Sequence, residues 1–135
     1  PQDTSRCVFS LLFSGTLARC PDIRFIFCHN GGSVPMIAGR AEVMGYTKVM
    51  AEHIPNGMDY ELQRLYYDVA LSANRPSLAA LFNFVPTSQV LLGTDYPFGA
   101  TSDTIRGLEE YGLDTGDLQA IYRGNAERLL PQYKK

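Results

Sequence analysis

The sequence predicts an α/β protein built on a parallel sheet, and two observations carry this prediction. First, three short runs rich in β-branched and aromatic residues, too brief for helices, occur at 23–28, 66–71 and 89–93. Second, segments with helical spacing separate these runs. Strands that alternate with helices are joined by right-handed crossovers into a parallel sheet. Such a sheet is either open, with helices on both faces, or part of a closed barrel.

The helical segments are predicted from apolar spacing and from the residues that begin or stop helices. The first covers residues 3–19, where Val8, Leu11 and Leu12 share one face and Pro21 follows the end. A cluster of turn-forming residues that includes His53 is predicted to form an exposed polar turn at 52–60. The remaining helices are predicted at about 35–51, 61–65, 76–84, 102–111, 115–122 and 125–130, the last with Asn125 as its cap.

Composition describes one ordinary globular domain spanning residues 1–135, with 45% hydrophobic and 19% charged residues. The formal net charge is −2 and no cluster of Lys or Arg stands out, so neither nucleic acid nor a membrane surface is expected as a partner. The three cysteines form an odd set without a CxxC pair. They are therefore predicted to be buried free thiols, and the protein is predicted to be cytoplasmic.

Polar residues follow the predicted strands at the positions where parallel sheets carry their functional groups. His29 follows the first strand and Asp95 the third, about two βα units apart, so both are expected at one mouth of a barrel. His29 is either a structural histidine or a group that transfers protons. Asp95 is either a cap for the turn at Pro97 or a metal ligand. Asp68 lies inside the second strand, and a structural role is predicted for it.

Four segments together resemble a known family. The segments Arg24–Gly32 (RFIFCHNGG), Leu65–Ala73 (LYYDVALSA), Leu91–Phe98 (LLGTDYPF) and Gly124–Leu130 (GNAERLL) resemble, in the same order, amidohydrolase-related metal-dependent decarboxylases. Aminocarboxymuconate semialdehyde, 6-methylsalicylate and γ-resorcylate decarboxylases belong to that family. The resemblance implies that the chain is the C-terminal part, about three βα units, of a TIM-type (β/α)₈ barrel. On this mapping its strands are the sixth to the eighth.

The same resemblance implies roles for four residues. Asp95 corresponds to the carboxylate ligand of a divalent metal, with Zn²⁺ expected and Mn²⁺ as the alternative. His29 corresponds to a catalytic histidine that handles a proton on metal-bound water or on substrate. Phe98 corresponds to an aromatic wall of the substrate pocket, and Asn30 to a substrate-binding residue in the loop that carries His29. The implied substrate is a small-molecule carboxylate.

This sequence departs from the family pattern in its histidines. Relatives carry a His-x-His pair after the first barrel strand and another histidine after the fifth, but this chain contains only two histidines. A catalytic zinc site uses about three protein ligands. We therefore expect the N-terminal strands to be absent, and the chain to be completed by a missing N-terminal half or by assembly into a homo-oligomer.

The sequence accordingly predicts a metal-dependent decarboxylase of a small aromatic or unsaturated acid, incomplete or inactive as an isolated chain. One alternative is a metal-dependent hydrolase of an amide, ester or lactone on the same barrel. Another is a non-catalytic barrel remnant that serves as an assembly subunit. The last is an open doubly wound domain, whose Gly31–Gly32 loop would bind an anion at the next helix N-terminus.

Overall fold

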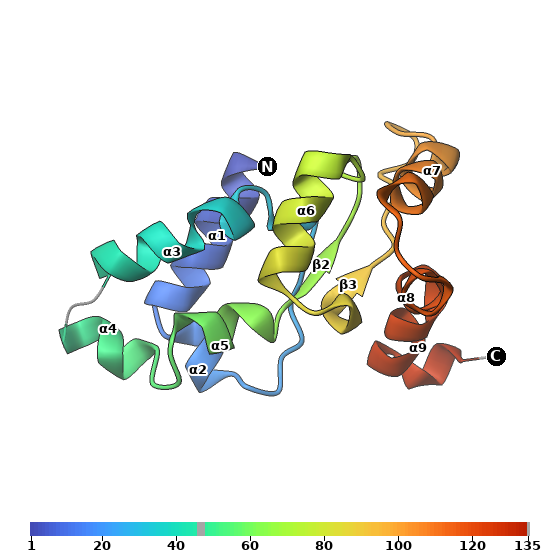
Figure 1. Ribbon diagram of the computed structural model, residues 1–135. Coiled ribbons are helices and arrows are strands. Elements are labelled where there is room, and N and C mark those ends of the chain that lie inside the picture. Colours follow the sequence, from blue (N-terminus) through green and yellow to red (C-terminus); the bar gives the residue numbers. More distant parts are fainter. Residues whose placement is uncertain (46–47, 135) are drawn as a thin grey trace.

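A short parallel sheet forms the centre of the fold. The computed structural model describes residues 1–45 and 48–134, and it contains strands β1 (Ile26–Phe27), β2 (Tyr66–Asp68) and β3 (Val90–Leu91). They lie side by side in the order β1-β2-β3, and both pairings are parallel (Figure 1). The three predicted strands are confirmed, although each pairs over fewer residues than its apolar run.

The predicted helix over residues 3–19 is two helices. Helix α1 covers Gln2–Phe13 and helix α2 covers Thr16–Arg19. The break occurs because Gly15 adopts a left-handed conformation (φ 72°) and its N–H donates to the carbonyl of Leu12, a helix-ending arrangement that glycine favours. The periodicity was therefore correct as far as Leu12, which is buried, but it continued across a helix end.

Between β1 and β3 the chain contains β2 and a series of helices and helical turns. Its elements are the single-turn η1 (His29–Gly31), α3 (Val34–Gly45), α4 (Lys48–His53), α5 (Met58–Gln63), α6 (Arg75–Phe84) and η2 (Thr87–Gln89). Of the helix predicted at about 35–51, residues 46–47 lie outside the described part. The prediction for His53 was wrong: it ends α4, is half-buried, and its ring Nδ1 lies 2.6 Å from the carbonyl oxygen of Phe13.

The C-terminal region contains α7 (Thr101–Tyr111), α8 (Thr115–Gln119), a π-helical turn (Ala120–Gly124), α9 (Asn125–Leu129) and η4 (Pro131–Tyr133). Asn125 was predicted to cap the last helix, and this was wrong. Its backbone is helical (φ −67°) and continues the π-helical turn without a break. Its side chain is buried and donates to the carbonyls of Val90 (2.7 Å) and Thr87 (2.8 Å). Asn125 therefore joins the last helix to β3.

Only one face of the sheet is well covered by the described residues. Phe27, Tyr67 and Val90 are register partners, all buried, and the Tyr67 ring also packs edge-on against Phe84 of α6. Because side chains alternate along a strand, Ile26 points to the opposite face, and it is 48% exposed. Leu91 lies on that same face and is 6% exposed, so the face is open mainly at β1. Helices on one face and an exposed apolar side chain on the other agree with a section of a barrel wall.

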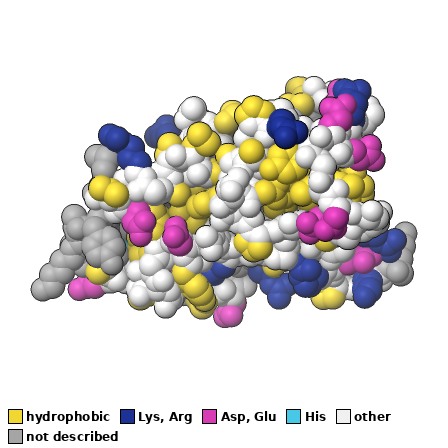
Figure 2. Space-filling view, viewed as in Figure 1, with side chains coloured by type: hydrophobic (Ala, Val, Ile, Leu, Met, Phe, Trp, Pro, Cys, Tyr) yellow, Lys and Arg dark blue, Asp and Glu magenta, His cyan; other side chains and the backbone are white. Residues whose placement is uncertain are grey.

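Charged side chains of both signs are scattered over the face of the molecule that Figure 2 shows. Lys and Arg side chains alternate there with Asp and Glu side chains, mostly near the outline, and hydrophobic side chains are visible in the middle. This distribution agrees with the small net charge of −2. That neither nucleic acid nor a membrane surface is a partner stays a prediction.

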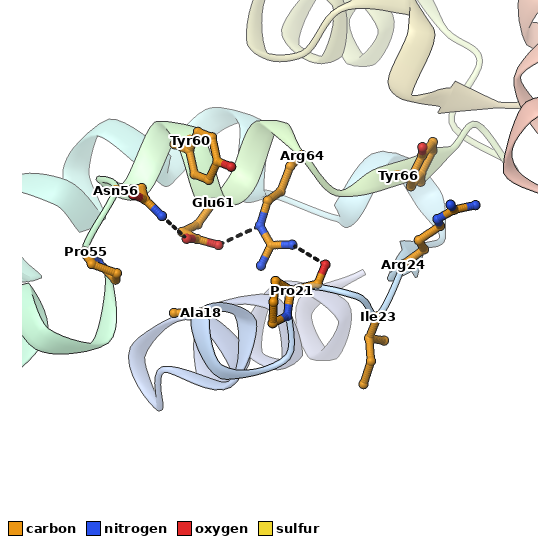
Figure 3. Close-up of a pocket in the computed structure, with 10 residues that line it drawn as sticks. All are labelled: Ala18, Pro21, Ile23, Arg24, Pro55, Asn56, Tyr60, Glu61, Arg64 and Tyr66. Carbon is orange, nitrogen blue, oxygen red and sulfur yellow. Dashed lines mark hydrogen bonds and ion pairs between the residues drawn. The ribbon is translucent and has the colours of Figure 1, made fainter.

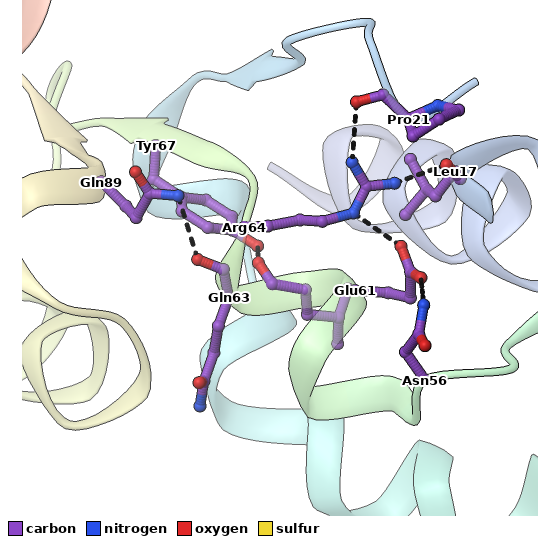
Figure 4. A network of polar contacts seen from close by, with 9 residues as sticks. Leu17, Pro21, Asn56, Glu61, Gln63, Arg64, Tyr67 and Gln89 are labelled. Atoms are coloured by element: carbon purple, nitrogen blue, oxygen red, sulfur yellow. Dashed lines mark hydrogen bonds and ion pairs between the residues drawn. The ribbon is translucent and has the colours of Figure 1, made fainter. Parts of the chain in front are cut away.

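A buried ion pair ties α5 to the end of α2 (Figure 4). Glu61 is 1% exposed, and its carboxylate accepts from Arg64 Nε at 2.7 Å. Arg64 also donates to the backbone carbonyls of Leu17 and Pro21. Nearby, the Tyr67 hydroxyl donates to the carbonyl of Leu62 at 2.9 Å. These bonds hold the N-terminal helices against the start of β2.

The cysteines do not follow the prediction of buried thiols. All three are free, but Cys7 and Cys28 are exposed and Cys20 is only partly buried. The prediction failed because an apolar neighbourhood in sequence does not identify the covered face, and Cys28 leaves β1 on the side opposite Phe27. A cytoplasmic location stays a prediction. Among the described residues, no helix has both the length and the apolar character needed to span a membrane.

Candidate active site

The ends of the three strands bring the predicted polar residues to one edge of the sheet. His29 follows β1 after one residue, and Asp95 lies four residues beyond β3. Since the strands are parallel and β2 lies between the other two, β1 and β3 are about 10 Å apart, two strand spacings. His29 and Asp95 therefore lie on the same edge, as predicted, at the carboxyl ends of the strands.

The ring of His29 is oriented by the neighbouring strand. Its Nδ1 lies 2.8 Å from the backbone carbonyl oxygen of Ala70. A carbonyl can only accept a hydrogen bond, so Nδ1 carries the proton and the neutral ring leaves Nε2 unprotonated. Nε2 makes no hydrogen bond to the described residues. This is the tautomer that a proton acceptor needs, and it is fixed by the fold.

The backbone of His29 is held in an unusual conformation. His29 and Asn30 both have left-handed φ values, 55° and 58°. Residues other than glycine adopt this region at a cost of about 1–3 kcal/mol each, and such residues cluster at functional sites. The N–H of His29 donates to Asp68 Oδ1 at 3.1 Å. The loop after β1 is therefore stabilised by contacts with Asp68 of β2 and with Ala70, which follows β2.

Left-handed residues also follow the other two strands. Leu71 follows β2 with a φ of 47°, and Asp95 follows β3 with a φ of 57°. Each of the three strands is thus followed by a non-glycine residue in this region, which no composition or periodicity signal had indicated. The coincidence of this conformation with the predicted site residues supports the assignment of this edge as the site.

The carboxylate of Asp95 is available for a ligand. Asp95 is half-buried, and no hydrogen bond or ion pair joins its carboxylate to the described residues. Its backbone carbonyl, rather than its side chain, accepts from the N–H groups of Phe98 (2.8 Å) and Gly99 (3.2 Å). The alternative of a side-chain cap for the turn at Pro97 is therefore not supported.

Asn30 and Phe98 differ in their surroundings. Asn30 is 3% exposed and its Nδ2 donates to the carbonyl of Ser72 at 3.2 Å. Its Oδ1 is buried without a hydrogen-bond partner among the described residues, and Asn30 lines the same cavity as His29, so the contact with substrate stays a prediction. Phe98 is 84% exposed, so the described residues do not enclose it. Its prediction as a pocket wall requires parts of a barrel beyond residues 1–135.

Two cavities differ in whether the polar groups that line them are free to bind a ligand. One of about 380 Å³ includes His29, Asn30 and Ser72 in its lining, together with residues of α3 and α6. Another of about 330 Å³ lies at the opposite, amino-terminal end of the strands, and Figure 3 shows Glu61 and Arg64 inside it. There the two charges are bound to each other, and Arg64 also donates to the backbone carbonyls of Leu17 and Pro21. The first cavity is therefore the one that belongs to the candidate site.

The described residues do not form a complete metal centre. Among them, no three His, Cys, Asp or Glu side chains are close enough together to hold a metal ion. Asp95 fits as one ligand because its carboxylate has no other partner within the described part of the chain, but a catalytic zinc site takes about three protein ligands. The described residues therefore offer one ligand of a metal centre, Asp95, and not a complete set of ligands.

Comparison with known proteins identifies the family. A family model described as amidohydrolase matches residues 2–132. The chain belongs to the amidohydrolase family. Decarboxylase macB of Penicillium terrestre is 33% identical over 141 residues, which cover 99% of this chain and 41% of that protein. The 6-methylsalicylic acid decarboxylase of Penicillium expansum is 32% identical over 145 residues, which cover 99% of this chain and 43% of that protein.

Solved structures confirm the predicted fold class. Metarhizium anisopliae IDCase in apo form aligns with a TM-score of 0.82 and 23% identity, over 99% of this chain and 40% of that one. A dihydroxybenzoic acid decarboxylase from Polaromonas, solved with bound manganese and the inhibitor 2-nitroresorcinol, aligns with a TM-score of 0.83 and 19% identity, over 99% and 41%. The three parallel strands thus match a section of the TIM barrel of these amidohydrolases, which rules out the open doubly wound sheet. The chain spans about two fifths of the length of the curated relatives it matches.

Two contacts of His29, with Asp68 and with Ala70, were not predicted from the sequence. Asp68 was assigned a structural role without a partner, and Ala70 contributes through its backbone carbonyl. A carboxylate at the carboxyl end of the central strand was the available signal for Asp68. No side-chain signal could have indicated the carbonyl of Ala70.

Proposed function

We propose that this chain forms part of a metal-dependent decarboxylase that acts on a small aromatic or unsaturated carboxylic acid. The observation that carries the proposal is the His29–Ala70 contact, which leaves Nε2 of His29 free to take and deliver a proton. The relatives support the reaction class, since the similar proteins are named as decarboxylases of 6-methylsalicylic acid and of 2-amino-3-carboxymuconate-6-semialdehyde.

The proposed centre holds a divalent metal, with Asp95 as the ligand that this chain supplies. The remaining ligands come from strands outside residues 1–135, in keeping with the incomplete donor set of the described residues. Zn²⁺ is the proposed ion and Mn²⁺ the alternative, because the Polaromonas decarboxylase is described with bound manganese. When bound, the metal would stabilise negative charge that develops on the substrate.

His29 is proposed to deliver the proton that replaces carbon dioxide. When the bond between the substrate carbon and its carboxylate breaks, the electron pair stays on that carbon and carbon dioxide leaves. The carbon then takes a proton from Nε2, which has taken that proton from solvent water beforehand, and the ring returns to the neutral form with the proton on Nδ1. Holding this ring at a fixed orientation supports the transfer, because proton transfer requires hydrogen-bond reach.

A direct experiment separates the decarboxylase from a non-catalytic remnant. The protein that carries this chain together with its remaining barrel strands is incubated with 6-methylsalicylate or 2,6-dihydroxybenzoate, and carbon dioxide release and bound zinc or manganese are measured. We expect release of carbon dioxide with stoichiometric metal. Metal without decarboxylation of either acid, together with hydrolysis of an ester or lactone, would replace the proposal by the hydrolase; neither metal nor turnover would replace it by the remnant.

Two variants assign the roles. Asp95→Ala is expected to lose bound metal and activity together, whereas His29→Ala is expected to keep the metal and lose activity. Asp59→Ala serves as the matched control, because Asp59 is exposed on α5, away from the strand ends. Equal metal retention in Asp95→Ala and His29→Ala would contradict the ligand role of Asp95.

A further inference from the structure

Asp68 occupies the central position among the three strand ends. It is the last residue of β2, which pairs with β1 on one side and with β3 on the other. In the sheet register Asp68 lies opposite Leu91 of β3. Asp68 therefore lies between the segment that carries His29 and the segment that leads to Asp95.

One oxygen of Asp68 holds two backbone groups. Oδ1 accepts from the N–H of His29 at 3.1 Å and from the N–H of Ala70 at 2.9 Å. These bonds connect His29, two residues beyond β1, to Ala70, two residues beyond β2. A carboxylate that accepts backbone N–H bonds makes stronger contacts than a neutral acceptor would. The left-handed backbone at His29 thus has a charged acceptor directed at its N–H.

The same residues close a ring of hydrogen bonds. Asp68 accepts from the N–H of His29 and of Ala70, and the carbonyl of Ala70 accepts from Nδ1 of His29. The bond that fixes the imidazole joins His29 to Ala70, and both of these residues donate their backbone N–H to the carboxylate of Asp68. If Asp68 moved, the backbone of His29 and the carbonyl that selects its tautomer would lose their common anchor.

Close packing against Gly93, two residues beyond β3, restricts the position of this carboxylate. A Cβ atom added at Gly93 would lie 2.7 Å from Cγ of Asp68 and 2.9 Å from its Oδ1. Distances this short are not tolerated between such atoms, so position 93 accommodates Asp68 only because it has no side chain. Gly93 is two residues before Asp95. The position of Asp68 is thus defined by all three strands.

We propose that Asp68 is a positioning residue that sets the tautomer and orientation of His29, with Gly93 supplying the space that Asp68 requires. Asp68 itself acts on the substrate only through His29. Its effect on turnover rests on the proposed decarboxylase function, whereas its effect on the His29 ring does not. The two can therefore be measured separately.

The first readout is the nitrogen-15 spectrum of the His29 ring, recorded at pH 8.5, where an ordinary histidine is neutral. It is measured on the protein that carries this chain together with its remaining barrel strands, with His29→Gln to assign the signal. In the unaltered protein we expect a protonated Nδ1 and an unprotonated Nε2. Asp68→Asn retains an acceptor oxygen and is expected to preserve that pattern. Asp68→Ala is expected to give a mixture of both tautomers.

A second route to the same effect leaves Asp68 intact. Gly93→Ala places a methyl group against the carboxylate and is expected to produce the same mixture of tautomers. Gly39→Ala is its control, because nothing lies within 4 Å of a Cβ at that position on α3. Asp59→Asn is the control for the loss of an aspartate charge. Both controls are expected to keep the spectrum of the unaltered protein.

The second readout is turnover. Loss of groups that orient an active-site residue typically costs roughly 10–100-fold, so kcat is expected to fall by that factor in Asp68→Ala with KM nearly unchanged. Asp68→Asn is expected to recover most of kcat. The proposal is overturned if Asp68→Ala and Gly93→Ala both retain a pure Nδ1-protonated ring. If the spectra change as expected but no variant or unaltered protein decarboxylates the substrate, the positioning role stands and the decarboxylase proposal fails.

Discussion

Nδ1 of His29 lies 2.8 Å from the backbone carbonyl oxygen of Ala70, so a residue two positions beyond β2 fixes the ring that follows β1. Replacement of His29 by Gln removes the group that exchanges the proton. Positioned acid–base groups typically contribute roughly 10²–10⁴-fold, and a fall of about that size in kcat is expected for decarboxylation. His53→Gln is the matched control, since His53 contacts Phe13 between helices. A loss of kcat in His53→Gln as large as in His29→Gln would contradict the assignment.

Much of this site could be predicted because strand ends carry a sequence signal. An apolar run followed by a polar residue located His29 and Asp95 at one edge of the sheet, and the structure places both there. The bonds that organise the site could not be predicted. The carbonyl of Ala70 belongs to the backbone, and the contact between Asp68 and the N–H of His29 joins residues 39 positions apart.

The errors in predicting the helix ends also have physical causes that the sequence pattern does not show. The break at Gly15 follows a local rule that the apolar spacing concealed, whereas the continuous helix through Asn125 departs from one. Glycine ended a helix within an apolar pattern, and a residue that often caps helices was buried because its amide donates to the carbonyls of Thr87 in η2 and Val90 in β3. Phe98 is 84% exposed, and because the chain spans about two fifths of the length of its relatives, its role as a pocket wall stays a prediction.

Gly31 is expected to tolerate no side chain. Its φ is 72°, and an added Cβ would lie 2.6 Å from Cε1 of the buried Tyr67 ring. Gly31→Ala combines backbone strain with a steric clash, so the free energy of unfolding should fall by about 1–3 kcal/mol. Denaturant unfolding measures this change. Gly39→Ala, in open space on α3, should leave stability unchanged or raise it by up to about 1 kcal/mol.

Asn125 is expected to stabilise the contact between the last helices and β3. Asn125→Ala removes donors to the carbonyls of Val90 and Thr87 in a site that is 1% exposed. Unpaired buried acceptors cost about 1–3 kcal/mol, and a loss of that size in the free energy of unfolding is expected. The comparison is Asn83→Ala, which removes an exposed bond within α6 and should change stability by less than about 0.5 kcal/mol. Similar losses in the two variants would show that burial of Asn125 does not matter.

The Glu61–Arg64 pair should be far more sensitive to loss of its cation than a surface pair is. Arg64→Met leaves the Glu61 carboxylate, 2% exposed at its side chain, without its ionic partner. Removing one partner of a buried pair typically costs about 3–5 kcal/mol. Arg106→Met breaks an exposed pair with Asp103 and should cost less than about 1 kcal/mol. Chemical denaturation of both variants tests the ranking, and equal costs would reject it.

Tyr67 gives the stability a dependence on alkaline pH. Burial raises the pKa of its hydroxyl well above the ordinary value of about 10, because the charged form would be desolvated. Above about pH 10 the unfolded tyrosine loses its proton while the folded one keeps it. The folded state then binds more protons, so this contribution to stability is full below about pH 10 and falls as pH rises.

Tyr67→Phe isolates this effect. At pH 7 the variant should be less stable by about 1 kcal/mol, because the carbonyl of Leu62 loses its donor. Above about pH 10 the difference between the two proteins should move in favour of the phenylalanine variant by up to roughly 1.4 kcal/mol per pH unit. Urea unfolding at pH 7 and between pH 10 and 11 measures both differences. A difference that stays constant across this range would mean that the Tyr67 hydroxyl ionises as readily in the folded protein as in the unfolded chain.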